Sequence, residues 1–175
     1  MSTLGWQRLL VQFCKTTIRI YGPQYLRYPN PTDVERLLRV GKNRGFPGML
    51  GSLDCCHWVW KNCPTAWAGQ FRGKAQKPTI ILEAVASYDL WIWHAFFGMP
   101  GSNNDINVLD RSPLFSEIYD GRAPAAKFSI NGRQYSMGYY LADGIYPPLA
   151  TLVQSISSPV TLKKKVSIRF STDLT

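Results

Sequence analysis

Acidic residues are scarce in this chain, and that scarcity narrows its possible partners. The 175 residues include 11 Asp and Glu against 20 Lys and Arg, for a formal net charge of +9. After Asp143 the sequence contains no Glu at all. A basic balance favours polyanionic partners, with nucleic acid ahead of anionic membrane. Composition alone also leaves open a basic protein that has no specific polyanionic partner.

Long apolar runs are missing as well. A membrane-spanning helix needs roughly 20 consecutive apolar residues. The longest candidate, Pro78 to Pro100, is interrupted by Glu83, Asp89 and His94. The N-terminus lacks a basic segment followed by a long apolar one, so we expect neither a secretory signal nor a membrane partner.

The cysteines show no disulfide-framework spacing, so we expect reduced thiols in an intracellular protein. Three of them lie near His57, which raises the alternative of a zinc site. Their spacing fits no common zinc finger, and packing on a strand is the favoured interpretation. The four cysteines are Cys14, Cys55, Cys56 and Cys63.

The residues that are present predict one folded domain preceded by helices. Apolar residues make up 45% of the chain and aromatic residues 13%, which is typical of a globular protein. Apolar positions at helical spacing predict a helix over Leu4–Tyr21, ended by Gly22-Pro23. Thr32 to Glu35 resembles a capping box, so a second helix should run through about Arg39 and end near Gly41 or Gly45. We expect these two helices to pack as a lead-in to the domain.

The remaining chain predicts a mixed sheet. Apolar and β-branched runs at 48–60, 78–87 and 90–98 read as strands, the last two forming an antiparallel hairpin. A helix capped by Ser102 or Asn103 should run toward Tyr119, with Pro113 kinking or splitting it. A loop over 121–132, a fourth strand over 134–141 and a short helix over 149–156 complete the set. This order suggests an α/β, RNase H-like mixed sheet.

Three aspartates stand at the ends of these elements. Asp54 follows the first strand's apolar run, Asp105 opens the helix after the third strand, and Asp143 follows the fourth strand. Few acids, well placed in a basic protein, suggest carboxylates that hold a divalent metal against a phosphate backbone. Each also has a structural alternative. An N-cap or a turn explains Asp54, a helix cap explains Asp105, and an Asp-Gly turn explains Asp143.

Basic and aromatic residues offer a second candidate surface. Four cations cluster between the first two strands and predict a DNA-backbone patch, with an ordinary solvated loop as the alternative. The tryptophans at 58, 60, 91 and 93 are typical of base-stacking platforms, although core burial explains them better. His94 is interpreted as a structural residue. The four cations are Lys61, Arg72, Lys74 and Lys77.

Several motifs together resemble the nuclease domain of plant PIF/Harbinger-type transposases and related transposase-derived nucleases. The resemblance covers roughly Arg8 to Ser157. It is carried by Arg44–Asp54 (RGFPGMLGSLD), His57-Trp58, Trp60–Pro64 (WKNCP), Leu82–Ala86 (LEAVA), Leu90–Gly98 (LWIWHAFFG), Pro100–Asp105 (PGSNND) and Leu141–Pro147 (LADGIYP).

The resemblance implies a DDE nuclease that uses Mg²⁺ or Mn²⁺ on an RNase H-like fold. The family's catalytic acids correspond to Asp54 and Asp143, and Asp105 corresponds to a further acid associated with the metal site. It also implies DNA as substrate, a Myb-like DNA-binding partner and a nuclear location, with the cytoplasm as a second possible location. It divides the chain into a helical lead-in (1–45), a partial nuclease domain (46–157) and a divergent basic tail (158–175).

The chain departs from this family after about Ser157. The family's final Glu, carried on a helix after the Asp143 motif, has no counterpart here. We therefore expect an RNase H-like sheet that is incomplete at its C-terminal side, and impaired cleavage because one metal is poorly held. The alternative is a non-catalytic DNA- or protein-binding module derived from a transposase. A tail that contains Lys163 to Lys165 is typical of nuclear entry signals, although a chance basic run explains it more simply.

Overall fold

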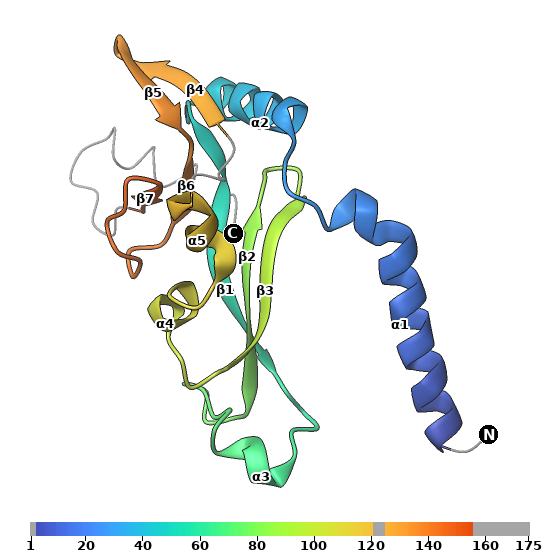
Figure 1. Ribbon diagram of the computed structural model, residues 1–175. Helices are drawn as coiled ribbons and strands as arrows, with labels where there is room; N and C mark the ends of the chain where they lie inside the picture. Colours follow the sequence, from blue (N-terminus) through green and yellow to red (C-terminus); the bar gives the residue numbers. More distant parts are fainter. Residues whose placement is uncertain (1–2, 121–124, 156–175) are drawn as a thin grey trace.

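A five-stranded mixed sheet forms the centre of the computed structural model, which describes residues 3–120 and 125–155 (Figure 1). β1 pairs with β2 and β2 with β3 in antiparallel fashion, whereas β1–β6 and β6–β7 are parallel. This sheet confirms the predicted α/β fold, including the antiparallel hairpin of β2 and β3. In spatial order the strands are β3 (Ile92–Pro100), β2 (Thr79–Ala86), β1 (Met49–Val59), β6 (Tyr139–Ala142) and β7 (Leu152–Gln154).

One face of the sheet is covered by the helices that follow β3. The predicted helix is split at Pro113, as its ring requires, into α4 (Asp105–Leu109) and α5 (Pro113–Tyr119). Burial along β2 alternates strictly, and its odd-numbered residues point to these helices. The core on this covered face contains Leu53, Val85, Leu109, Leu114, Phe115, Ala142, Tyr146 and Leu152.

The other face of the sheet is exposed over β1, β2 and β3, and we call it the open face. Directly paired residues of neighbouring strands point to the same side. The register therefore places Cys56, Leu82 and Phe97 in one row of the open face, and Asp54, Ala84 and Ala95 in the next. Further open-face residues are Trp58, Ile80 and Ile92.

Helix α2 (Pro31–Asn43) packs against the sheet, as expected, but it begins earlier than predicted. Val34 and Leu37 are buried with Trp93 on β3. The capping box is formed by Asn30 and Asp33 rather than by Thr32 and Glu35. Pro31 explains the shift, because proline suits the first helical position and places the cap immediately before it.

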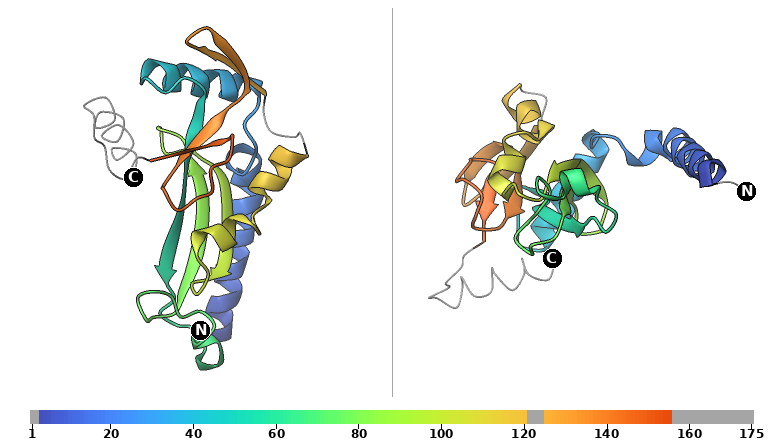
Figure 2. Two further views of the ribbon diagram at one scale, coloured as in Figure 1. Left: turned by 90° about the vertical axis from the view of Figure 1, so that its left-hand side faces the viewer. Right: turned by 90° about the horizontal axis from the view of Figure 1, so that it is seen from below.

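Helix α1 (Thr3–Tyr25) also differs from the prediction, because it continues through Gly22-Pro23. Pro23 lies in the last turn, where its fixed φ is helical and its missing N–H removes only one bond. Leu26 N–H still donates to Gly22 O at 2.8 Å. Both figures of the whole chain show α1 standing clear of the sheet on the β3 side, so it does not pack as a lead-in (Figures 1 and 2).

The prediction of a loop over 121–132 is wrong for the residues that the structure describes. Residues Ala125–Ile130 form β4, which pairs with β5 (Arg133–Met137) as a separate two-stranded hairpin. Asn131 and Gly132 both have positive φ, 51° and 80°, which is the conformation that a tight hairpin turn favours. The predicted single strand over 134–141 is correspondingly divided between β5 and β6.

Gly138 marks this division. A Cβ at this position would lie 2.6 Å from the Leu50 side chain and 3.1 Å from Gly48 O, so β6 approaches β1 too closely for any larger residue. The chain therefore leaves the hairpin at Met137 and enters the main sheet at Tyr139.

The prediction of a helix over 149–156 is also wrong for the residues that the structure describes. Leu152–Gln154 forms β7, in parallel register with Tyr140–Ala142. A short apolar run fits a buried strand as well as a helix, and the free edge of β6 selects the strand. Ile156 and the basic tail at 158–175 lie outside the described residues. A short helix α3 (Thr65–Ala68), which was not predicted, interrupts the loop between β1 and β2.

Candidate metal and nucleic-acid site

Asp54 and Asp143 come together at the carboxyl end of the parallel pair β1–β6. Ser52 on β1 is in register with Leu141 on β6. Two residues further along each strand are Asp54 and Asp143, so extending this register sets the two acids side by side. Asp54 follows the buried Leu53 and therefore points to the open face. Asp143 is exposed, and its Oδ1 accepts from the N–H of Ile145 at 2.9 Å in an Asx-type turn.

The charge environment of Asp54 is unfavourable for a bare carboxylate. Partial burial raises the pKa of Asp54, and the like charges of Asp143 and Asp105 raise it further. The N–H of Cys55, which donates to Asp54 Oδ1 at 2.8 Å, opposes this shift. A cation placed between Asp54 and Asp143 would relieve the repulsion.

Asp105 is positioned differently from the other two acids. It is the first residue of α4, after the cap residue Asn104, whose side chain accepts from the N–H of Asn107. Its Oδ1 lies 3.4 Å from Nε2 of His57. His57 lies three residues after Asp54 on β1. Because neighbouring side chains of a strand point to opposite faces, this odd spacing places His57 on the covered face. Figure 1 shows α4 alongside the part of β1 that extends past β6.

These positions allow a test of the predicted metal site. Carboxylate oxygens suit Mg²⁺ and Mn²⁺, and Mg²⁺ commonly takes only one or two protein carboxylates and keeps several waters. Asp54 and Asp143 fit that requirement. Within residues 3–120 and 125–155, however, no three His, Cys, Asp or Glu side chains are close enough together to hold one ion. Asp105 therefore lies near the pair without completing a three-ligand site.

A hydrogen-bonded pair beneath the acids was not predicted from the sequence. Tyr146, almost fully buried after the Asp143 turn, donates its hydroxyl to Cys55 Sγ at 3.3 Å. Burial raises the pKa of the Cys55 thiol to about 12, with further contributions from Asp105, Glu83 and Asp54. Cys55 is therefore a protonated, unreactive thiol at neutral pH. All four cysteines of the chain are free.

A second buried cluster lies beside it on the covered face. Glu83 is fully buried on β2, and its Oε1 is 3.0 Å from Nε2 of His94. The same nitrogen lies 3.1 Å from Oγ of Ser112, which precedes α5. The second oxygen of Glu83, Oε2, has no hydrogen-bond partner among the described residues. His94 is thus a structural residue, as expected, and the apolar surroundings of Glu83 in the sequence gave no sign of its partner.

The four predicted DNA-contacting cations lie on one exposed segment between β1 and β2. Trp60, Trp67 and Phe71 pack together there, with ring centroids 5.0 to 6.4 Å apart, and give the segment an aromatic core. In the described part of the chain none of the four cations forms an ion pair, so their charge is available to a polyanion. They are Lys61, Arg72, Lys74 and Lys77.

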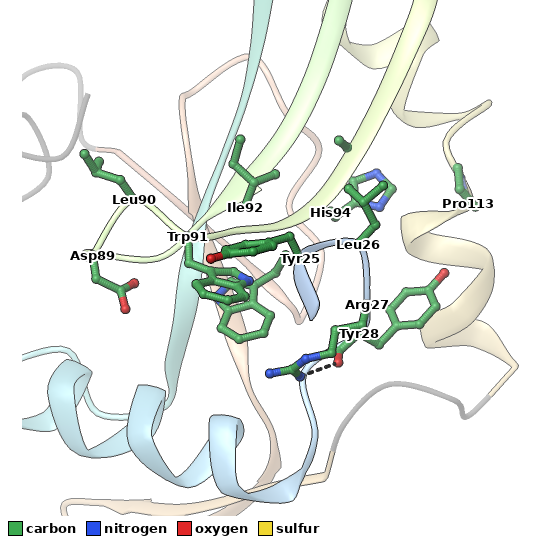
Figure 3. Close-up of a pocket in the computed structure, with 12 residues that line it drawn as sticks. Tyr25, Leu26, Arg27, Tyr28, Asp89, Leu90, Trp91, Ile92, His94 and Pro113 are labelled. Carbon is green, nitrogen blue, oxygen red and sulfur yellow. Dashed lines mark hydrogen bonds between the residues drawn. The ribbon is translucent and has the colours of Figure 1, made fainter. Parts of the chain in front are cut away.

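The four tryptophans considered as stacking platforms have different surroundings. Trp93 is buried, Trp91 is half-buried against it with ring centroids 5.5 Å apart, and Trp60 belongs to the aromatic cluster above. Only Trp58 among these four is strongly exposed, at 59%. A cleft of about 640 Å³ opens beside Trp91 and Trp93 and is lined by the chain after α1, but none of the three aspartates lines it (Figure 3).

The fold and the site together define an α/β protein whose mixed sheet carries paired carboxylates just past the stretch where two of its strands pair in parallel. Residues 23–172 match the plant transposon protein family. The chain therefore belongs to that family, and its origin is transposon-related. No curated protein and no solved structure matches it. Within the described residues no helix is long and apolar enough to cross a membrane.

Proposed function

We propose that this chain is a transposase-derived nuclease domain of the Harbinger DDE type, which acts on DNA phosphodiester bonds with Mg²⁺ or Mn²⁺. The observation that carries the proposal is the pairing of Asp54 with Asp143 just past the parallel stretch of β1 and β6. A membership in the plant transposon protein family supports it. The nucleus and a Myb-like DNA-binding partner belong to the same proposal and rest on the resemblance alone.

Asp54 and Asp143 would hold the metal ion. When bound, the ion would supply positive charge for the attacking and leaving oxygens of a phosphodiester. Asp105 would orient the imidazole of His57. This imidazole lies on the covered face of β1, whereas Asp54 lies on the open face. The cations at 61, 72, 74 and 77 would hold the DNA backbone. Because only two carboxylates meet in this arrangement, we expect weak turnover by the chain alone.

Metal binding and cleavage should be measured separately. Mn²⁺ should raise the melting temperature of the parent chain, because it binds the folded state and relieves repulsion between the acids. It should not raise that of Asp54→Asn or Asp143→Asn. Asp110→Asn, an exposed acid at the end of α4, is the matched control and should respond like the parent. If Mn²⁺ still raised the melting temperature of both site variants, the proposed metal site would be wrong.

Cleavage of supercoiled plasmid should then depend on Mn²⁺ or Mg²⁺ and disappear in Asp54→Asn. A metal-dependent melt without any cleavage would favour the second candidate, a non-catalytic DNA-binding module. That candidate is supported by the lack of a third converging ligand among the described residues and by the unpaired basic segment. Filter binding to plasmid in the presence of EDTA tests it directly.

A further inference from the structure

Helix α1 is the largest apolar element without a packing surface in the described structure. Its large side chains are mostly more than half exposed, including Trp6 at 62%, Leu10 at 63% and Phe13 at 68%. Leu4, Val11, Ile18 and Tyr25 recur every seven residues, and Trp6, Phe13 and Ile20 form a second such row. The polar residues Arg8, Gln12, Lys15 and Arg19 occupy the remaining narrow face. Such a pattern is typical of a helix buried on a broad apolar side.

The open face of the sheet likewise exposes apolar side chains that no other element covers in the described structure. Trp58 is 59% exposed, Phe97 62% and Ile92 49%, and Cys56 is exposed between them. Between these side chains run the half-buried Ile80, Leu82 and Ala84 of β2. A sheet of this kind normally buries both faces against other elements. Contiguous apolar patches of this type mark an interaction surface.

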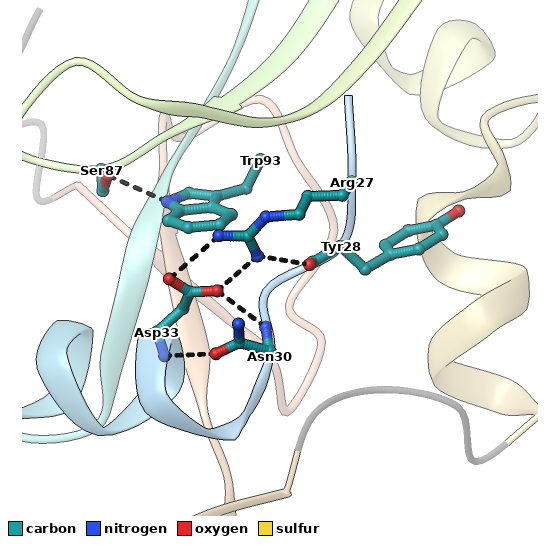
Figure 4. A network of polar contacts seen from close by, with 6 residues as sticks. All are labelled: Arg27, Tyr28, Asn30, Asp33, Ser87 and Trp93. Atoms are coloured by element: carbon teal, nitrogen blue, oxygen red, sulfur yellow. Dashed lines mark hydrogen bonds and ion pairs between the residues drawn. The ribbon is translucent and has the colours of Figure 1, made fainter. Parts of the chain in front are cut away.

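The end of α1 is fixed in a way that keeps the helix off its own sheet. The Tyr25 ring stacks on Trp91, with centroids 5.0 Å apart and planes 23° apart (Figure 3). Two residues later, Arg27 forms an ion pair with Asp33 at the start of α2 and lies over the Trp93 ring at 5.7 Å (Figure 4). These contacts hold the chain at the β3 edge, and from there α1 runs away from the sheet (Figure 2).

We propose that the chain forms a homodimer in which α1 of each copy packs on the open face of the other. The dimensions agree, because the 23 residues of α1 span about 35 Å and the 11 residues of β1 about 36 Å. Two symmetric contacts form at once, as in a two-fold dimer with exchanged elements. The proposal does not depend on nuclease activity, and because Asp54 lies on the open face it describes a state of the chain in which DNA does not reach Asp54.

Native cysteines allow a direct test. Cys14 is exposed on the apolar side of α1, and Cys56 lies on the open face. Cys55 does not interfere, because it lies on the covered face and its thiol accepts a hydrogen bond from Tyr146, and Cys63 is removed by Cys63→Ser. In that background a short bis-maleimide should link Cys14 of one copy to Cys56 of another. Neither Cys14→Ser nor Cys56→Ser should be cross-linked alone, whereas an equimolar mixture of the two should give a covalent dimer.

The other arrangements give different products. A cross-linked monomer in the background protein, with no dimer from the mixture, would mean that α1 folds back on its own sheet. A dimer from Cys56→Ser alone would mean that two α1 helices pair with each other. Either product overturns the proposal, as does the absence of any cross-link in the background protein.

Sedimentation equilibrium of the full chain gives an independent reading. The parent chain should have twice the mass of a monomer. Phe13→Glu, on the apolar side of α1, should halve that mass, whereas Gln12→Glu, on the polar side, should leave it unchanged. Because α1 stands clear of the domain, both variants should keep the circular dichroism and near-ultraviolet signals of the folded sheet. A parent monomer at tens of micromolar would contradict the proposal.

Discussion

Asp54 illustrates how a single residue can be unfavourable for the fold and still be suited to a proposed metal site. Its carboxylate is partly buried on β1 and repelled by Asp143 and Asp105, so its pKa is raised. The folded chain therefore holds this proton to a higher pH than the unfolded chain does. At a pH above the raised pKa, the charged carboxylate reduces the free energy of unfolding, and this loss fades as the pH falls through that pKa toward 3.8.

Asp54→Asn should accordingly raise the melting temperature at pH 7 in EDTA, by a few degrees at most, since surface charge changes rarely exceed about 0.5 kcal/mol. The difference from the parent should shrink as the pH is lowered through the raised pKa and below 3.8, where Asp54 is protonated in both states. Glu35→Gln on α2 controls for the loss of one negative charge from a basic chain. A gain in stability that grows toward low pH would contradict this account.

The buried pair of Glu83 and His94 has the opposite character, because each partner needs the other. His94→Leu would leave the fully buried Glu83 carboxylate without its partner, and we expect a loss of about 3–5 kcal/mol in the free energy of unfolding by urea. Glu83→Leu combined with His94→Leu should cost less than the sum of the two single changes. Additive losses would mean that the two side chains do not interact.

At the residue scale, sequence patterns located the acids but not their surroundings. Asp105 and Asp143 stand at the element ends where they were predicted, because apolar runs and cap residues determine those positions locally, whereas Asp54 lies in the middle of β1, which continues to Val59. That Asp105 meets His57, and that Cys55 accepts from Tyr146, depends on contacts between residues 48 and 91 positions apart. No local pattern carries such information, and the three-carboxylate site remains a prediction.

Elements were predicted best where local turn and proline signals mark their limits and worst where glycine divides a strand. The antiparallel hairpin of β2 and β3 and the break at Pro113 were readable from the sequence alone. The β4–β5 hairpin was missed although Asn131-Gly132 is a strong turn signal, because the neighbouring Gly, Pro and Ala residues suggested a loop. β7 depends on a free edge of β6, which only the assembled sheet provides.

Gly48 ties the hairpin to the main sheet, and this gives a prediction about both elements. Its φ is +91°, and a Cβ there would lie 2.2 Å from the Phe128 ring of β4. Gly48→Ala should therefore reduce the free energy of unfolding by about 2–4 kcal/mol, from backbone strain and overpacking together. Gly45→Ala is the matched control, because Gly45 has a similar φ of +88° but open space around its Cβ position.

Gly45→Ala should show the strain alone, about 1–2 kcal/mol. Phe128→Ala should destabilise the chain by itself but should remove the steric part of the Gly48→Ala effect in the double variant. If Gly48→Ala and Gly45→Ala prove equally destabilising in urea titrations, the close packing of Phe128 on β1 is not significant for stability.

At the scale of the whole molecule, charge is unevenly distributed. The net charge of +9 produces a general attraction for polyanions. The segment between β1 and β2 adds four cations that have no ion-pair partner among the described residues, at one end of the sheet, supported by the cluster of Trp60, Trp67 and Phe71. A specific DNA-binding surface there would contribute more to binding than the same charges placed elsewhere.

Replacing Lys61, Arg72, Lys74 and Lys77 with Ala should weaken binding to duplex DNA and reduce the slope of log K against log salt by up to about 3.6, at about 0.9 for each phosphate contact. The control replaces four exposed cations at the other end of the molecule, Arg39, Lys42, Lys127 and Arg133, with the same change in net charge. Fluorescence anisotropy over a range of salt concentrations measures both. Equal losses in the two sets would indicate non-specific attraction only.

The open face carries Asp54 and the apolar residues of β1, β2 and β3 on one continuous surface. Any molecule that covers those apolar side chains also excludes water from the carboxylate beside them. If Asp54 holds an ion as proposed, ion affinity and association with that molecule are thermodynamically linked, and each must change the other by the same factor. For a homodimer, the apparent ion affinity of such a site would depend on protein concentration. An ion titration carried out at two protein concentrations would then give two different apparent affinities.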